Sequence, residues 1–243
     1  MSKLTLYFVI GFAGLAAQTL QTNNQAPDVD ERTLQDKYHI VPTEEGLIGA
    51  LQHQEAAVRS FAAIKLAYDG DKAAIRPILD AMASEKIPGV KIGLATAAAQ
   101  LGTDEGLNAL KSMCEDRNWS PTARMIAAQS MILNVGRQEC LSDILDVLRS
   151  ADALPEGYPA ATIALNLLAY NRFKKIPPSQ LDEIRDLCAM YLKNRALGLR
   201  MAAGTCIRDQ GGPWAISQLR AAIDAEPDEA VRDSLRKDLL SVR

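Results

Sequence analysis

Two histidines, His39 and His53, are the only imidazole side chains that this chain offers for acid–base chemistry or metal binding. Zinc sites and histidine-based proton transfer need further ligands or partners at fixed spacing. Neither histidine lies in an HExxH pattern, and neither is followed by a glutamate. We therefore interpret both as polar surface or loop residues, and we predict no catalytic, cofactor-binding or metal-binding residue.

Four cysteines, Cys114, Cys140, Cys188 and Cys206, are the other side chains with chemical reactivity. Their spacing fits no zinc signature, but an even number of cysteines in an exported protein permits disulfides. On the helix pattern given below, Cys114 and Cys140 fall at opposite ends of parallel helices. Cys188 and Cys206 fall on facing antiparallel helices, with an axial mismatch of about 9 Å. We interpret all four as buried free thiols and leave Cys188–Cys206 as the one pair to test for a bond.

A cluster of aromatic and basic residues is the candidate interaction site. Aromatic anchors beside basic side chains are frequent at protein interfaces. A solvated loop is the alternative interpretation. Trp119 and Trp214 stand near prolines at helix starts, where we expect them to pack against turns. The candidate cluster consists of Tyr158, Tyr170, Phe173, Lys174 and Lys175.

Alanine and leucine, with 37 and 30 of the 243 residues, dominate the composition. Both are strong helix formers, and aromatic residues make up only 5% of the chain, so the composition argues against a β-sandwich or barrel. The net charge is −3, and no basic run is longer than Lys174-Lys175. Because nucleic-acid binding usually needs a concentrated basic face, we predict no nucleic-acid partner.

The N-terminus has the pattern of an export signal. Lys3 precedes an uncharged apolar run, Leu4 to Ala17, which is shorter than a bilayer span. Gly14-Leu15-Ala16 offers a cleavage site, with Ala17 as the other choice. We predict a signal peptide over residues 1–17 and a flexible linker over 18–42 with one short helix near Asp30–Tyr38. An uncleaved membrane anchor and an ordinary buried helix are the alternatives for the apolar run.

The rest of the chain repeats one pattern. Segments of the type Val58-Arg59-Ser60-Phe61-Ala62-Ala63 recur, and their basic residues are 32, 33, 76 and 32 positions apart. The gap of 76 contains one further unit, in which Ala161 replaces the basic residue. Six units of two helices each follow from this count. The first helices are expected at 44–53, 71–84, 104–116, 138–150, 179–193 and 213–226, and the basic residues are Arg59, Lys91, Arg124, Arg200 and Arg232.

These segments resemble those of the HEAT-repeat family, including the HEAT-like repeats of phycobilin lyases, over residues 43–243. The resemblance implies an all-α, right-handed α-solenoid of about six HEAT-like helix pairs, preceded by the signal peptide and the linker. It also implies that the basic residue ties the turn between two helices to its neighbour, so we interpret the five basic residues as a structural ladder. Glu55–Arg59 and Asp228–Arg232 have the spacing of ion pairs within one helix. The fourth unit departs from the pattern, which predicts a bend or an irregular stack there.

A solenoid offers a long surface to a peptide or protein. We therefore expect an exported, periplasmic or extracellular, non-enzymatic module or scaffold that binds an unidentified protein, with no cofactor and no stable membrane span after cleavage. The alternative is a HEAT-like lyase, or a lyase-chaperone subunit, that acts on a bound cofactor or partner protein. The charged residues at the C-terminal end, Arg236, Lys237, Asp238 and Arg243, predict a solvent-facing end cap.

Overall fold

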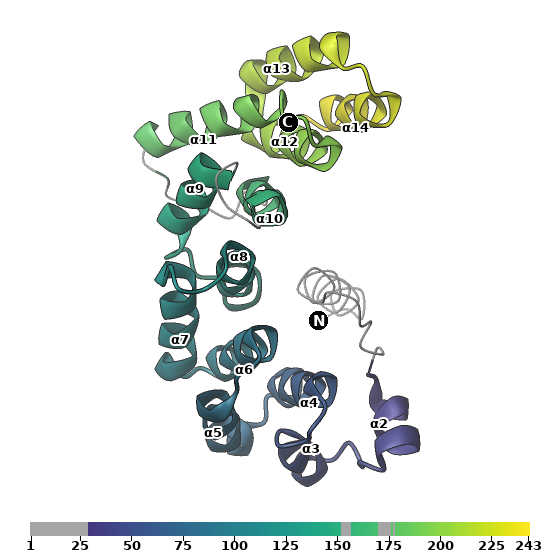
Figure 1. Cartoon of the computed structure of the whole chain (residues 1–243), viewed down its shortest axis with the longest axis vertical. Coiled ribbons are helices and arrows are strands. Elements are labelled where there is room, and N and C mark those ends of the chain that lie inside the picture. Colours follow the sequence, from purple (N-terminus) through teal and green to yellow (C-terminus); the bar gives the residue numbers. More distant parts are fainter. Residues whose placement is uncertain (1–28, 152–156, 170–175, 177) are drawn as a thin grey trace. The chain divides into compact units, whose positions relative to one another are not determined.

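The computed structural model describes residues 29–151, 157–169, 176 and 178–243. Within these residues every regular element is a helix, as the composition predicts (Figure 1). None of the described helices has the length and apolar character needed to cross a membrane. The predicted signal peptide and residues 18–28 of the predicted linker lie outside the described residues.

Six pairs of helices follow one another within the described residues, which confirms the number of repeats that the basic residues predict. Each second helix begins a few residues before the recurring basic position or its replacement. The first helices are α3 (Glu44–Ala50), α5 (Ile75–Ser84), α7 (Asp104–Glu115), α9 (Leu141–Ser150), α11 (Pro178–Tyr191) and α13 (Gly212–Ala225). The second helices are α4 (Ala56–Asp69), α6 (Pro88–Gln100), α8 (Pro121–Gln129), α10 (Gly157–Ala169), α12 (Leu197–Gln210) and α14 (Glu229–Leu240).

The helix ends are set by local chemistry. The Thr43 and Thr103 hydroxyls accept hydrogen bonds from the third N–H groups of α3 and α7, at 3.3 and 3.2 Å. At its other end, α4 closes on Gly70, whose φ of 74° is left-handed and therefore suits glycine. These signals depend on a few neighbouring residues, which explains why the sequence predicts most helix ends to within a few positions.

The chain divides into two compact units, residues 1–119 with 126–140, and residues 120–125 with 141–243. In the first unit α4 packs against α6, and in the second α10, α12 and α14 pack in order. Alanines at these contacts let the helices approach closely, because they add no side chain beyond Cβ. Ala62, Ala63 and Ala203 in these helices are fully buried.

Helix α2 (Glu31–Tyr38) precedes the first repeat, at the position where the sequence predicts one short helix. The carboxylate of Asp30 caps it by accepting a hydrogen bond from the Thr33 N–H at 2.6 Å. Leu34 is fully buried in the core of the first repeats, and Glu31 lies 3.5 Å from Lys65 of α4. The described part of the segment expected to be a linker, residues 29–42, therefore packs against the first repeat.

The C-terminal repeat matches the predicted end cap except at one residue. Arg236 and Lys237 are exposed, but Asp238 is only 5% exposed, so the prediction that it faces solvent is wrong. Its carboxylate accepts a hydrogen bond from Arg208 of α12 at 3.0 Å, beside Gly204. Burial raises the pKa of Asp238, against the lowering effect of Arg208.

The cysteines correct another prediction, because all four form disulfides and no cysteine is free. Cys114 bonds Cys140 with a Cα–Cα distance of 6.2 Å, and Cys188 bonds Cys206 at 6.1 Å. The predicted distances assumed regular helices of matched length. In the structure α8 continues into a π-helical segment, Ser130–Val135, and Cys140 lies before α9, with its sulfur 3.5 Å from that of Met131. The connection 192–196 between α11 and α12 is centred on the expected turn, yet the Cα atoms of Cys188 and Cys206 lie only 6.1 Å apart, so an offset counted along the helices does not give their separation.

Candidate interaction surface and basic clamp

The predicted interaction cluster is described at Tyr158 alone, since Tyr170, Phe173, Lys174 and Lys175 lie outside the described residues. The Tyr158 hydroxyl, at the start of α10, accepts a hydrogen bond from Arg195 Nε at 2.7 Å. The guanidinium of Arg195 also lies 5.5 Å from the centre of the Tyr158 ring. This contact places the start of α10 beside the start of α12, because Arg195 belongs to the turn that leads into α12.

The two histidines lie in turns, as predicted. His39 ends α2 with a left-handed backbone, φ 55°. His53 lies between α3 and α4, and its Nδ1 accepts a hydrogen bond from the Glu55 N–H at 3.0 Å. Among the described residues no group of three His, Cys, Asp or Glu side chains is arranged to hold a metal ion.

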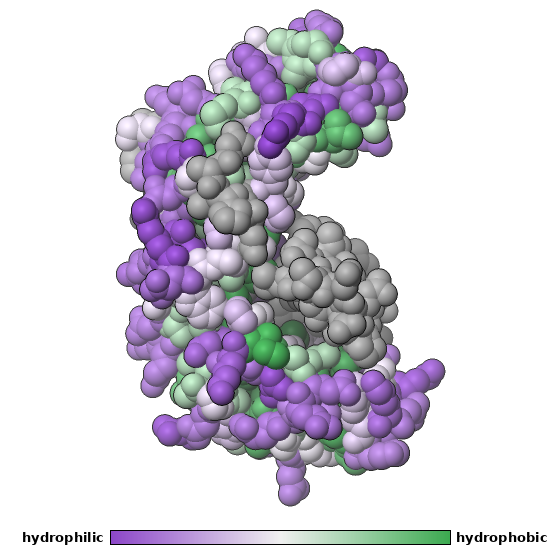
Figure 2. Space-filling view, viewed as in Figure 1, coloured by the Kyte–Doolittle hydropathy of each residue, from purple (hydrophilic) through white to green (hydrophobic). Residues whose placement is uncertain are grey.

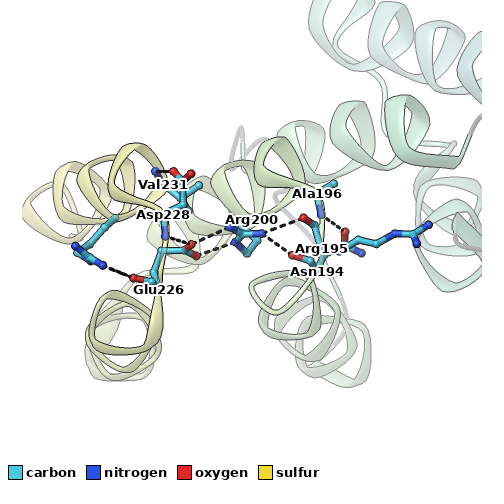
Figure 3. Close-up of polar contacts among 8 residues, drawn as sticks. Asn194, Arg195, Ala196, Arg200, Glu226, Asp228 and Val231 are labelled. Carbon is cyan, nitrogen blue, oxygen red and sulfur yellow. Dashed lines mark hydrogen bonds and ion pairs between the residues drawn. The ribbon is translucent and has the colours of Figure 1, made fainter.

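The Arg200 side chain of α12 joins two consecutive repeats (Figure 3). Its Nε and Nη2 donate to the two carboxylate oxygens of Glu226, at 2.7 and 2.8 Å. Its Nη1 donates to the carbonyl oxygens of Asn194 and Arg195, at 2.9 and 3.2 Å. One guanidinium therefore holds the turn before its own helix and the carboxylate at the end of the next repeat's first helix, α13.

The same arrangement occurs in the other unit around Arg59 of α4. Its Nε donates to Glu85 at 2.7 Å, and its Nη1 donates to the carbonyl oxygens of His53 and Gln54 at 2.7 and 3.0 Å. In both units the acid follows the arginine by 26 residues, and the two carbonyls precede it by five and six. We call each set of contacts a basic clamp.

The acids of both clamps are held in their charged form. The hydrogen bond from Arg200, together with the Asp228 N–H, keeps the pKa of Glu226 below its ordinary value despite burial. Burial alone would raise the pKa of Glu85, but the bonds from Arg59 and the Ile87 N–H outweigh it and lower that pKa too. A buried carboxylate that accepts hydrogen bonds from a guanidinium and a backbone N–H stays ionised. It therefore has a structural role and is not available to transfer protons.

The other positions of the ladder vary. Arg232 of α14 donates to the Glu226 carbonyl oxygen at 3.1 Å, and Arg124 of α8 pairs with Asp143 of α9 at 3.1 Å. Where Ala161 replaces the basic residue, other groups join α9 to α11. Tyr191 donates its hydroxyl hydrogen to the Leu148 carbonyl oxygen at 2.6 Å, and Arg149 pairs with Glu183.

Both ion pairs predicted within one helix are wrong. Glu55 instead accepts a hydrogen bond from the Tyr38 hydroxyl at 2.6 Å, and Asp228 caps α14 by accepting from the Val231 N–H at 3.0 Å. For Arg59 and Arg200 the signal that identifies the acidic partner is a glutamate 26 residues later, directly after a first helix. Spacing within one helix does not contain that signal.

Helices α10 and α12 of the second unit carry uncharged side chains at four positions that can form one surface. Tyr158 and Thr162 lie four residues apart on α10, and Leu197 and Met201 lie four apart on α12, so each pair shares one side of its helix. Leu197 is 48% and Met201 38% exposed, although most of the described surface visible in Figure 2 is hydrophilic. We call these four residues the α10–α12 face.

The first helices of this unit differ in character. Between α11 and α13 lies an open groove of about 560 Å³, which includes charged and amide side chains and one exposed methionine, Met190. The groove is lined by Asp186, Ala189, Met190, Tyr191, Lys193, Asn194 and Gln218.

Comparison with known proteins gives one family match and several structural matches. The sequence matches the HEAT repeats family over residues 44–132, and no curated protein matches it. A designed armadillo repeat protein is 15% identical (83% of this chain, 100% of that chain, TM-score 0.46), and an engineered protein is 17% identical (82% and 95%, TM-score 0.44). Human deoxyhypusine hydroxylase, in complex with glycerol, is 17% identical, with 99% of each chain covered and a TM-score of 0.32. Residues 44–132 are thus HEAT repeats, and the helix pairs described beyond them continue in the same order to Leu240.

Proposed function

We propose that this chain is an exported, non-enzymatic module that binds another protein through the α10–α12 face. The observation that carries the proposal is the difference in charge between α10 and its neighbour α11. Helix α10 contains no charged residue, whereas α11 exposes Asp182 and Asp186. Exposed apolar side chains with one charged neighbour, Arg195, favour an apolar, uncharged segment of a partner, because few charges have to be desolvated on contact.

The side chains of the α10–α12 face suit this task. Methionine adapts its shape to different surfaces, and tyrosine combines an apolar ring with a polar hydroxyl. Arg195 already holds the Tyr158 side chain in the free protein. Binding a partner therefore costs little further side-chain entropy at Tyr158. Leu197 and Met201 then supply apolar area that a partner removes from water.

Two features support the proposal of export to the periplasm or the cell exterior. The uncharged run Leu4 to Ala17 after Lys3 has the length of a signal sequence. The pairing of all four cysteines suits an oxidising compartment. Mass determination of the secreted or periplasmic protein is expected to give a chain that begins at Ala17 or Gln18. A full-length chain retained in the membrane fraction would contradict cleavage.

Charged substitutions on the α10–α12 face test the binding proposal. We expect the double variant Leu197→Glu, Met201→Glu to lose captured partner at least about tenfold, since two carboxylates would need desolvation at the interface. Its melting temperature is expected to stay close to that of the wild type, because both side chains are well exposed. The measurement is quantitative mass spectrometry of proteins cross-linked to the tagged chain in its own exported fraction.

The matched control is Met190→Glu, which places the same charge at a 52% exposed methionine on α11, outside the face. It is expected to retain the partner. Equal loss in the control and the double variant, or retention in both, would contradict this surface. A tetrapyrrole that co-purifies with the chain would instead favour the lyase alternative.

A further inference from the structure

The two disulfides lie one in each compact unit, and each is sealed from solvent. Cys114 and Cys140 belong to the first unit, and Cys188 and Cys206 to the second. All four cysteines are 0% exposed. Both Cα–Cα distances, 6.2 and 6.1 Å, fall in the range that a disulfide spans without moving the backbone.

Each bond joins segments that the basic clamps leave unconnected. The first bond connects the end of α7 to the turn before α9, across 26 residues that contain α8 and the π-helical segment Ser130–Val135. The second connects α11 directly to α12 within the fifth repeat. The clamps of Arg59 and Arg200 act elsewhere. Each joins the end of the next repeat's first helix to the turn that precedes the helix carrying the arginine.

Burial determines when the bonds can form and break. Thiol–disulfide exchange needs a thiolate that reaches a disulfide sulfur, and a mixed disulfide as intermediate. A sulfur that is fully covered in the packed repeat cannot be reached by an oxidant or a reductant unless the repeat opens. The bonds therefore form while the third and fifth repeats are open, and they are protected once the repeats close.

We propose that the chain matures by oxidative folding, with one structural disulfide locking each unit before its repeats close. In each case two cysteine thiols give up two protons and two electrons, and one sulfur–sulfur bond forms. The electrons reduce the disulfide of an oxidant, either a protein disulfide or a small-molecule disulfide, to two thiols. This inference concerns folding and holds whether or not the α10–α12 face binds a partner.

Counting thiols on the wild-type chain tests the proposal directly. Protein recovered from an oxidising compartment is expected to take up no alkylating agent when unfolded without reductant, and four equivalents when unfolded with reductant. In the native state, dithiothreitol is expected to act at least about tenfold more slowly than in denaturant, because reduction requires opening. Alkylation of two or four thiols without reductant, or equally fast native reduction, would overturn the proposal.

A cycle of alanine variants provides a second, independent test. If Cys188 and Cys206 are bonded, Cys188→Ala alone already removes the bond, so the double variant with Cys206→Ala is expected to melt close to the single variant. Both are expected to melt about 5–10 °C below the wild type. Free thiols would instead give two small shifts that add. The variants Cys114→Ala and Cys140→Ala repeat the cycle in the other unit. If one variant folds poorly, the other cycle and the thiol count still test the proposal.

Discussion

Replacing Arg200 by alanine is expected to lower the free energy of unfolding by about 3–5 kcal/mol, the usual cost of removing one partner from a buried ion pair. The substitution leaves Glu226, only 6% exposed, as a buried carboxylate without its two guanidinium donors. It also leaves the carbonyl oxygens of Asn194 and Arg195 without their Nη1 donor. Urea unfolding at neutral pH, followed by circular dichroism, measures the loss.

The control is Arg236→Ala, which removes an arginine of the same unit whose ion pairs with Glu229 and Asp233 are exposed. Exposed pairs contribute little, so a loss of less than about 1 kcal/mol is expected. Arg200→Lys should fall between the two, because an ammonium keeps the charge but cannot donate to both oxygens in the same plane. Equal losses for Arg200→Ala and Arg236→Ala would show that the clamp is not a main support of the repeat.

The pH dependence of the stability difference between the wild type and Arg200→Ala tests the role of Glu226. In the wild type the pKa of Glu226 is lowered, chiefly by Arg200, so its stabilisation is present above the ordinary pKa of glutamate, 4.5. That stabilisation is lost as the pH falls through the lowered value. Without Arg200, burial is expected to raise the pKa of Glu226, so that protonation favours the folded state. The difference between wild type and variant should therefore shrink on acidification below about pH 4.

The sequence predicts the six helix pairs because the signals for a helix pair are local. A recurring basic residue at 59, 91 and 124 fixes the register of the repeats, and capping groups such as Thr103 and Gly70 mark their ends. These signals act over a few residues, so the tertiary structure does not change them.

The partners of the arginines could not be predicted in the same way. Spacing within a helix favours Asp228 as the partner of Arg232, but a residue at a helix start gains more by capping backbone N–H groups. The acid that receives Arg200 lies 26 residues away and depends on how the next repeat packs. Of the proposed α10–α12 face, only Tyr158 belongs to the cluster that the sequence predicts, because the exposure of Leu197 and Met201 depends on which side of α12 packs against α10.

The prediction of four free thiols was wrong for a related physical reason. Distances along ideal helices ignore the π-helical segment before Gly136 and the position of Cys140 outside α9. A change of a few residues in register moves a sulfur by several ångströms, which is the whole tolerance of a disulfide.

Replacing Gly106 by alanine is expected to destabilise the first unit by about 3 kcal/mol or more, through overpacking against a backbone that cannot yield. A Cβ atom at this position of α7 would lie 2.4 Å from the Ala99 nitrogen and 2.7 Å from the Ala95 oxygen. Both atoms belong to the backbone of α6, so relief requires the two helices to separate. The alanines of α6 and the glycine of α7 are therefore matched, and this close approach gives the alanine-rich composition its role. Thermal and urea unfolding of the variant measure the cost.

Gly93→Ala is the matched control, because it makes the same substitution inside α6 at a position where a Cβ would meet nothing within 4 Å. Alanine there is expected to stabilise the unit by about 0.5–1 kcal/mol, since glycine inside a helix costs backbone entropy. The two substitutions should thus shift stability in opposite directions although both add one methyl group. A small or stabilising effect of Gly106→Ala would mean that α6 and α7 do not approach as closely as their backbones indicate. In that case the small residues would act through helix propensity alone, and both variants would be stabilised to a similar extent.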